Sequence, residues 1–400
     1  MQAQKQEKIG VLADALRNEA PTSLYVHIPF CARRCYYCDF VTAIAPETVV
    51  EAYLSALNHD LTAVAAANTA PLETVFFGGG TPTYLSSRQL GQVLTHLQDK
   101  FQIANAAEIT MEANPGSIHR EKLQVLRDHR VTRLSIGVQT MQPHLLKAIG
   151  RLHDVQTIFH SVDEATRVGF SHLSVDLIFG LPGQTLADIR MDLAAVAQLP
   201  IDHVSAYWLQ VEPGTPFARW QAVGQLELPG EDAEAEMYDE IRTTLQQIGF
   251  FQYEVSNFAR PGGQAKHNLV YWRNEPYLAA GVGASSYAFG VRQRREARVT
   301  EYIRRIIAGD SPVVENQPVT ALEAAQDTMM LGLRLQEGVD RQRFWFRHGV
   351  DMEKMFGNII RPLLSKGLLR WQGTHLVLTH RAWPVANLVF AEFIDSERIH

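Results

Sequence analysis

The chain has 400 residues, of which 46% are hydrophobic and 20% charged, a composition typical of a folded protein with one large and one smaller domain. Its formal net charge of −6 argues against a protein that mainly coats nucleic acid, and the one basic run, 292–298, is typical of a solvated loop or helix face. No apolar run approaches the roughly eighteen residues of a membrane span, and the polar N-terminus has no signal core. We therefore expect a cytoplasmic protein without a membrane anchor.

Short apolar, β-rich segments alternate with helical segments over the first two thirds of the sequence. This alternation predicts parallel βαβ units, and runs such as SVDLIF lack polar alternation because both faces of such a strand are covered. Six units predict an α/β fold with a partial (β/α)6 barrel of the TIM type over residues 23–260. The expected strands are 23–30, 73–80, 108–114, 133–139, 172–180 and 203–211, and the expected helices are 47–67, 86–100, 117–128, 154–168, 185–197 and 231–248.

The pattern changes after residue 260. A connecting segment rich in Gly and Pro over 261–309 precedes expected helices at 321–335, 341–348 and 352–366 and a hairpin at 369–378 around Gly373. This order predicts a smaller, mainly helical, winged-helix-like domain over 310–400. Ten Lys and Arg stand against nine Asp and Glu from 321 to 400, so we expect no nucleic-acid partner. Residues 1–22 are expected to form a helical extension.

All three cysteines, Cys31, Cys35 and Cys38, lie on one loop after the first expected strand. An odd number of thiols so close together is not a disulfide framework and indicates a reducing compartment. A structural zinc site is one alternative, but it needs four ligands, and the fourth would have to come from a residue such as His27. A 4Fe–4S cluster held by three thiolates would instead keep one iron open for a substrate.

Several unusual polar residues follow the other expected strands, at the face of a βα barrel that carries chemistry. They include the Gly-rich turn 78–82, Glu112, Gln139 and Asp176. Each has a structural alternative: a tight turn for the glycines, a surface or capping group for Glu112 and a hydrogen-bonded core amide for Gln139. Asp176 lies within a hydrophobic run, where an acid is rarely left unpaired, so ligand binding is favoured there.

In this order the motifs resemble those of the radical SAM superfamily, in its coproporphyrinogen III oxidase-like (HemN-like) branch. The matching strings are YVHIPFC, GGGTPT, EANPG, RLSIGVQT, GRLH, DLIFGLPGQT, VEPGTPF, YEVSNFARPG and HNLVYW, and they cover residues 24 to about 290. The resemblance implies a 4Fe–4S cluster on Cys31, Cys35 and Cys38 whose open iron chelates S-adenosylmethionine (SAM). One electron from a low-potential donor then cleaves SAM to methionine and a 5′-deoxyadenosyl radical.

The resemblance also implies residues that contact SAM. Tyr37 is expected against the adenine, the Gly-rich turn at the methionine amino group, and Arg151 at the carboxylate, although Arg151 could equally be an ordinary cation at a helix start. The SAM contacts that carry over are Tyr25, Tyr37, Gly79, Gly80, Thr81, Glu112, Gln139, Arg151 and Asp176.

Two departures from the oxidase pattern favour the haem chaperones of this branch. The oxidases have a fourth cysteine two places after the third, where this chain has Phe40, and only thirty residues precede Cys31 here, fewer than in the oxidases. The motif HNLVYW, which begins at His267, matches the chaperones. A neutral imidazole is a common haem ligand and Tyr271 and Trp272 offer flat apolar surface, so His267 is the candidate haem ligand, with a hydrogen-bonded core histidine as the alternative.

Three functions follow from this resemblance. The first is a chaperone that binds haem and transfers it to acceptor proteins, among which respiratory proteins and a transient membrane contact are open. The second is an oxygen-independent coproporphyrinogen III dehydrogenase, and the third is a HemN-like radical SAM methylase. We expect SAM binding and no coproporphyrinogen III oxidase activity, and the sequence leaves open whether SAM is consumed.

Overall fold

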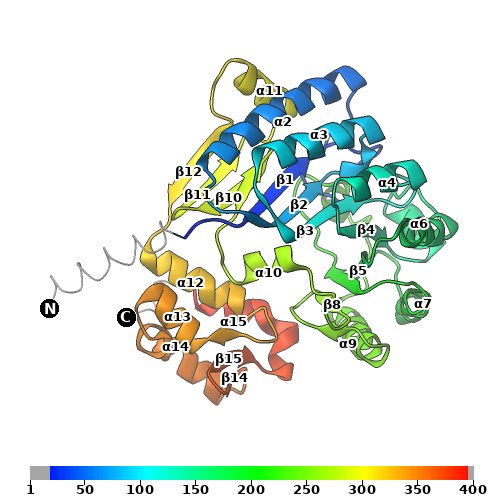
Figure 1. Ribbon diagram of the computed structural model, residues 1–400. Helices are drawn as coiled ribbons and strands as arrows, with labels where there is room; N and C mark the ends of the chain where they lie inside the picture. The colour runs from blue at the N-terminus through cyan, green and yellow to red at the C-terminus, as the bar shows by residue number, and fades with distance from the viewer. Residues whose placement is uncertain (1–18, 395–400) are drawn as a thin grey trace.

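The computed structural model describes residues 19–394, and a nine-stranded sheet forms the centre of the larger domain (Figure 1). The strand order is β7-β8-β6-β5-β4-β3-β2-β1-β9, and β1 to β6 pair in parallel. The parallel strands are β1 (Ser23–Ile28), β2 (Leu72–Gly79), β3 (Ile103–Ala113), β4 (Arg133–Gln139), β5 (His172–Phe179) and β6 (His203–Trp208). Since β7 and β9 stay at the two edges, the barrel is open, and the predicted partial (β/α)6 barrel is confirmed.

Helices follow each parallel strand and cover the outer side of the curved sheet (Figure 1). The expected helices agree with the observed ones to within three residues at each end. The largest difference is the start of α4, because Ser117 forms a turn with Asn114 and the side chain of His119 then caps the helix. The helices are α2 (Glu47–Ala67), α3 (Ser87–Lys100), α4 (Arg120–Asp128), α5 (Pro143–Ala148), α6 (Val155–Val168), α7 (Leu186–Val196), α8 (Pro216–Ala222) and α9 (Glu231–Gln247), with the 3-10 turn η1 (Pro82–Tyr84).

Alternation along the strands separates the hydrophobic core from the barrel interior. Leu24 and Val26 of β1 are fully buried in a core shared with the covering helices. Tyr25 and His27 alternate with them along the strand and therefore face the other side of the sheet. The register pairs Glu112 with Ser135 and Asp176 with Ser205 on neighbouring strands, so polar side chains are collected inside the barrel.

Short strands from beyond the sixth unit complete both edges of the sheet. β9 (Leu278–Ala280) pairs in parallel with β1, whereas β8 (Asn257–Ala259) pairs antiparallel with β6 and β7 (Phe251–Gln252) with β8. The hydrogen-bonded sheet thus extends into the connecting segment 261–309. A buried strand of three residues carries too little periodicity to be found in the sequence.

A second sheet lies beside the β9 edge and consists of β10 (Ser285–Ala288), β11 (Val291–Arg295) and β12 (Val313–Pro318). α11 (Val299–Ile307) connects β11 to β12 and packs against α2. One buried ion pair ties the second sheet to the barrel. Asp60 of α2 accepts hydrogen bonds from Arg295 Nε at 2.9 Å, from Gly281 N at 2.9 Å and from the Tyr302 hydroxyl at 2.9 Å. This carboxylate therefore joins three separate chain segments.

The C-terminal domain has its own hydrophobic core and confirms the expected helices followed by a hairpin. The hairpin turns at Gly373, whose φ of +60° favours glycine. α10 (Lys266–Trp272) packs between β2 and α12 and so joins the two domains in space. The C-terminal domain contains α12 (Ala321–Gly332), β13 (Val339–Asp340), α13 (Arg341–His348), α14 (Met352–Ser365), β14 (Leu369–Gln372), β15 (His375–Leu378), the 3-10 turn η2 (His380–Val385) and α15 (Ala386–Glu392). The helical extension expected over 1–22 falls mostly on residues 1–18, which lie outside the described residues.

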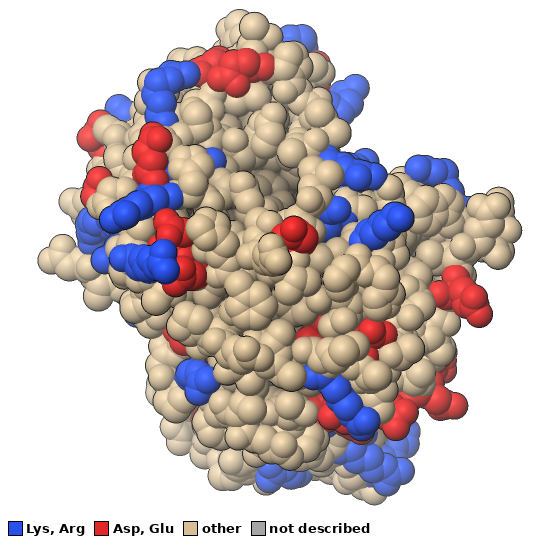
Figure 2. Space-filling view, turned by 90° about the vertical axis from the view of Figure 1, so that its right-hand side faces the viewer, with Lys and Arg blue, Asp and Glu red and all other residues tan. Residues whose placement is uncertain are grey.

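Lys and Arg are interspersed with Asp and Glu on the face in Figure 2, and the surface is hollowed near its upper centre, where it is mostly uncharged. Between residues 19 and 394, no helix combines the length and the apolar character needed to cross a membrane.

We predict that Asp60→Ala lowers the free energy of unfolding by about 3–5 kcal/mol, because it leaves the buried Arg295 guanidinium without its partner. Chemical denaturation followed by circular dichroism measures this change. Glu315→Ala is the matched control, because it breaks an exposed ion pair with Arg294, the neighbour of Arg295 on β11. It is expected to change the free energy of unfolding by less than about 1 kcal/mol. Equal effects of the two substitutions would contradict the structural role of Asp60.

Candidate functional site

The cysteine loop is held from three sides at the carboxyl end of β1. Cys31 N donates to Ala43 O at 3.1 Å, which closes the base of the loop. Tyr36 N donates to Ile149 O at 3.2 Å, and Tyr36 O accepts from Phe217 N at 3.1 Å. The loop thus gains its shape from elements that follow β4 and β6, far away in sequence.

The three thiols differ in burial and interact with one another. Cys31 is buried, whereas Cys35 and Cys38 are half-buried. Burial raises the pKa of Cys31. Burial also raises the pKa of Cys38, to about 11, and the neighbouring thiols of Cys35 and Cys31 add to this shift. A metal centre would reverse this effect, because coordination deprotonates a thiol. Among residues 19–394, no three His, Cys, Asp or Glu side chains are arranged to hold a single metal ion.

Arg151 connects this loop to the strand ends. Its Nη1 lies 3.4 Å from Cys35 Sγ, while Nη2 donates to Asn114 Oδ1 at 2.5 Å and to Gly137 O. Asn114 Nδ2 in turn donates to Thr81 Oγ1 at 2.7 Å, and that hydroxyl lies 3.4 Å from Cys31 Sγ. A guanidinium favours negative charge close to it, so this network suits a loop that carries thiolates.

Asn114 is a site residue that the sequence analysis did not single out. Its side-chain amide hydrogen-bonds both Thr81 and Arg151 and so links the Gly-rich turn to the guanidinium. The signal was present in the sequence, since this Asn directly follows β3 and precedes Pro115 and Gly116, where a strand end meets a turn.

The Gly-rich turn after β2 packs against β1. A Cβ on Gly79 would lie 2.5 Å from the His27 ring, and one on Gly80 would lie 2.5 Å from Pro29 O. Gly79 also has a φ of +120°, a conformation that favours glycine. Tight packing within the protein therefore requires these glycines whether or not a ligand also approaches them, and Gly79 N donates to Glu112 Oε2 at 3.0 Å.

Glu112 and Asp176 form the acidic part of the barrel interior. Burial, with a contribution from Asp176, raises the pKa of Glu112 to about 8. Burial likewise raises the pKa of Asp176 to about 6, although hydrogen bonds from Ser205 and Ser135 oppose the shift. A cationic ligand beside these carboxyl groups would lower their pKa values and so restore their negative charge, and hydroxyl groups on the ligand could donate hydrogen bonds to them.

The remaining predicted SAM contacts surround these groups. Tyr25 lies against Gly78 and Glu112 and shares a hydrogen bond of 2.9 Å with His27 Nδ1. Gln139 has a φ of +71°, rare for a residue with a side chain, and its amide lies over Gly137. Burial raises the pKa of Tyr37, which lies near Cys35 and Arg151. The structure thus gathers every predicted SAM contact around the mouth of one barrel.

His267 lies apart from these groups, on α10, which packs against β2. Its side chain is 0% exposed, with Nδ1 2.8 Å from Thr74 Oγ1 and Nε2 2.8 Å from the Tyr271 hydroxyl. Burial lowers the pKa of this imidazole to about 3, so it is neutral. Both ring nitrogens already have partners, so ligation of haem through Nε2 would require the hydrogen bond with the Tyr271 hydroxyl to break, whereas Nδ1 could keep Thr74.

A cleft of about 520 Å³ opens beside the cysteine loop and was not foreseen from the sequence. Its lining includes Arg33, Cys35, Lys122 and Arg151 but no Asp or Glu. Lys122 Nζ donates to Ser117 O at 2.9 Å and to Thr83 O at 2.5 Å, and burial lowers its pKa to about 8. The cleft therefore favours an anionic group near the sulfur atoms.

Comparisons with known proteins agree with this architecture. The sequence matches the family model of the radical SAM superfamily over residues 25–196 and that of the HemN C-terminal domain over residues 319–385. Three thiols at the carboxyl end of β1 in an open parallel barrel, followed by this second domain, define a radical SAM protein of the HemN-like branch. This family binds SAM and a 4Fe–4S cluster.

Similarity to single proteins is more specific. The chain is 38% identical over 376 residues to the heme chaperone HemW of Bacillus subtilis (strain 168), which covers 94% of this chain and 99% of that protein. It is 34% identical to the heme chaperone HemW of Escherichia coli (strain K12), over 87% of this chain and 90% of that protein. The chain belongs to the HemW family.

A solved structure extends the likeness to the whole fold. The coproporphyrinogen III oxidase HemN from Escherichia coli, described as a radical SAM enzyme, superposes with a TM-score of 0.83 and 25% sequence identity. The match covers 97% of this chain and 93% of that one, and therefore includes both domains.

We predict that Glu112→Gln flattens the pH dependence of stability. The folded pKa of about 8 exceeds the ordinary value of 4.5, so between these pH values the folded state binds more protons than the unfolded state. Stability of the wild type should therefore fall by roughly 2–4 kcal/mol, relative to the variant, as pH rises from about 5 to about 8. Urea denaturation of both proteins across this range, without added SAM, measures the difference. Parallel pH profiles would contradict a neutral, buried Glu112.

Proposed function

We propose that this protein binds haem and passes it to acceptor proteins, and that it carries a SAM-binding 4Fe–4S cluster. The observation that carries this proposal is the similarity to proteins named heme chaperone HemW, which spans 94% of the chain and thus both domains. The exposed Phe40 supports it further. This side chain is 62% exposed on the cysteine loop, at the position where the resembling oxidases have a fourth cysteine.

The thiols of Cys31, Cys35 and Cys38 would hold the cluster, and the absence of a fourth leaves one iron open to SAM. When bound, the cluster supplies one electron to the SAM sulfonium. Arg151 Nη1 lies 3.4 Å from the Cys35 sulfur atom, where its positive charge would suit a cluster held by thiolates. Hydrogen bonds through Asn114 and Thr81 connect Arg151 to Cys31 as well.

The barrel interior supplies the groups that would bind and orient SAM. Gly79, Gly80 and Thr81 offer backbone and hydroxyl groups at the strand end nearest the thiols. Glu112 and Asp176 match the cationic and hydroxyl-bearing parts of the molecule, because a nearby positive charge lowers the pKa of both carboxyls. Tyr25, Tyr37, Gln139 and Arg151 complete the set, Arg151 toward the carboxylate.

The partners follow from this chemistry. The proposed cluster needs a low-potential electron donor, and the haem needs acceptor proteins. The three free thiols support a reducing cytoplasmic setting. The oxidase stays the second candidate function, because its fold matches over both domains.

The deciding experiment is a haem titration of the anaerobically reconstituted protein, with coproporphyrinogen III and SAM assayed in the same preparation. We expect saturable binding of haem and no decarboxylation. Decarboxylation to protoporphyrinogen would instead establish the oxidase.

Replacing Cys31, Cys35 and Cys38 by Ala together is expected to abolish iron–sulfur absorption and the electron paramagnetic resonance signal. Haem binding should persist, because no haem contact is assigned to the thiols. Cluster absorption that survives in this triple variant would exclude these residues as the ligands, and far-ultraviolet circular dichroism controls for folding.

A further inference from the structure

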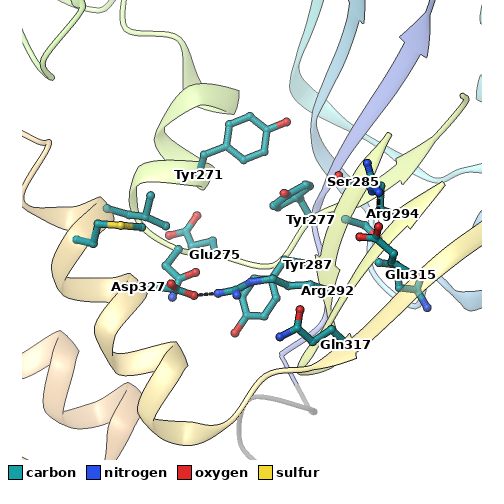
Figure 3. A pocket seen from close by; sticks show the side chains of 15 residues that line it. Tyr271, Glu275, Tyr277, Ser285, Tyr287, Arg292, Arg294, Glu315, Gln317 and Asp327 are labelled. Atoms are coloured by element: carbon teal, nitrogen blue, oxygen red, sulfur yellow. Dashed lines mark hydrogen bonds and ion pairs between the residues drawn. The ribbon is translucent and has the colours of Figure 1, made fainter. Parts of the chain in front are cut away.

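A cavity of about 560 Å³ lies between α10, α12 and the β10–β12 sheet, on a different part of the molecule from the thiols. Its volume falls in the range of small-molecule and cofactor sites. Figure 3 shows Tyr271 and Tyr277 projecting into the space, with Tyr287 and Arg292 from the sheet and Asp327 from α12 around it. Met330 and Leu331 of α12 add apolar surface to the lining.

Three tyrosines of this cavity differ in what their hydroxyl groups contact. The Tyr271 hydroxyl is hydrogen-bonded to His267 Nε2 at 2.8 Å, and the Tyr287 side chain is hydrogen-bonded to Arg347. Within the described part of the chain, no hydrogen bond is found for the Tyr277 hydroxyl. Among these three tyrosines, Tyr277 therefore offers a free hydroxyl oxygen to a ligand.

The backbone holds these rings in place. Tyr277 and Tyr287 exchange two backbone hydrogen bonds, of 2.7 Å and 3.1 Å, so their side chains emerge on the same face. The rings of Tyr271 and Tyr277 pack edge to face with centroids 4.7 Å apart. This aromatic wall is formed before any ligand binds.

Arg292 and Arg294 emerge from the sheet side of the cavity, two residues apart on β11 and hence on one face. Arg292 donates to Asp327 and Arg294 to Glu315, each through Nη2. A guanidinium has five donors, so each can also bind a second carboxylate or exchange one for another. Replacing one carboxylate partner by another in such partly exposed ion pairs changes the free energy of the folded protein little.

We infer that this cavity is the haem site: the porphyrin lies against Tyr271 and the apolar residues of α12, Arg292 and Arg294 bind its two propionates, and the Tyr277 oxygen ligates the iron. This inference rests on the proposed function and gives it a location. A planar apolar ring with two carboxylates and a metal that accepts an oxygen ligand matches the aromatic wall, the paired arginines and the free phenol together.

The assignment changes the role of His267. The imidazole does not line the cavity, but its Nε2 fixes the hydroxyl of Tyr271, which does. His267 is a positioning residue for one wall of the haem site, and the HNLVYW motif reaches haem through its tyrosine.

The test compares ferric haem with metal-free protoporphyrin IX on the full-length protein. Tyr277→Phe is expected to weaken ferric haem about tenfold and to remove the phenolate-to-iron charge-transfer band, while metal-free protoporphyrin binds as in the wild type. Replacing Arg292 and Arg294 by Gln together is expected to weaken both ligands tenfold or more, because both carry propionates. Ser285→Trp, at the exposed rim, should block both without touching the core.

Tyr84→Phe and Arg298→Gln are the matched controls, since neither side chain lines this cavity, and both should leave affinities unchanged. If Tyr277→Phe keeps the wild-type haem spectrum, or the arginine and Ser285 variants bind within twofold of the wild type, the inference is wrong. Loss of the haem spectrum in His267→Gln alone would return the iron ligand to His267. If the wild type binds no haem at all, the proposed function itself fails, independently of this site.

Discussion

The candidate SAM and cluster site depends on a single guanidinium. Arg151 follows β4 and α5, yet its contacts reach the cysteine loop after β1, Asn114 after β3 and the Gly137 carbonyl within β4. Parallel strands bring their carboxyl ends to one edge, but they do not fix the loops that follow them. Arg151 does so, because one planar group with several donors can satisfy acceptors from two loops and a strand at once.

The same cation limits the charge of the interior. Arg151 is the first opposing influence on the pKa of Tyr37 and also lowers that of Asp176 and of Cys31. It does not offset burial, which leaves Glu112 protonated at neutral pH. The barrel interior is thus short of positive charge, and binding of a sulfonium with its ammonium group would relieve that shortage. The shortage of positive charge therefore accounts both for the raised pKa values of the buried carboxyl groups and for the preference for a cationic ligand.

Much of this arrangement could be predicted from the sequence. The six βα units and the hairpin around Gly373 follow from periodicity and turn residues, because these signals are local. The thiols and the strand-end residues follow from motifs whose spacing reflects a loop at one strand end. Asn114 and Lys122 were missed, since their importance lies in partners such as Arg151 and Thr83, which belong to other loops and turns. β9 was missed because three residues are too few to show a period.

The role of His267 could not be read from its motif either, because its partners Thr74 and Tyr271 belong to different elements. In the structure it stands within a row of packed rings. Tyr25 stacks on Phe76 at 6.2 Å, Phe76 on His267 at 5.3 Å, and His267 meets Tyr271 at 5.0 Å.

That row begins at a predicted SAM contact and ends at the wall of the cavity that we assign to haem, where Tyr271 meets Tyr277 at 4.7 Å. Each ring is packed against the next, so a change in the position of Tyr25 on one side must be accommodated by the rings that follow. The packed row gives the two sites a physical connection inside the protein, and it gives a reason for a buried, neutral histidine midway between them.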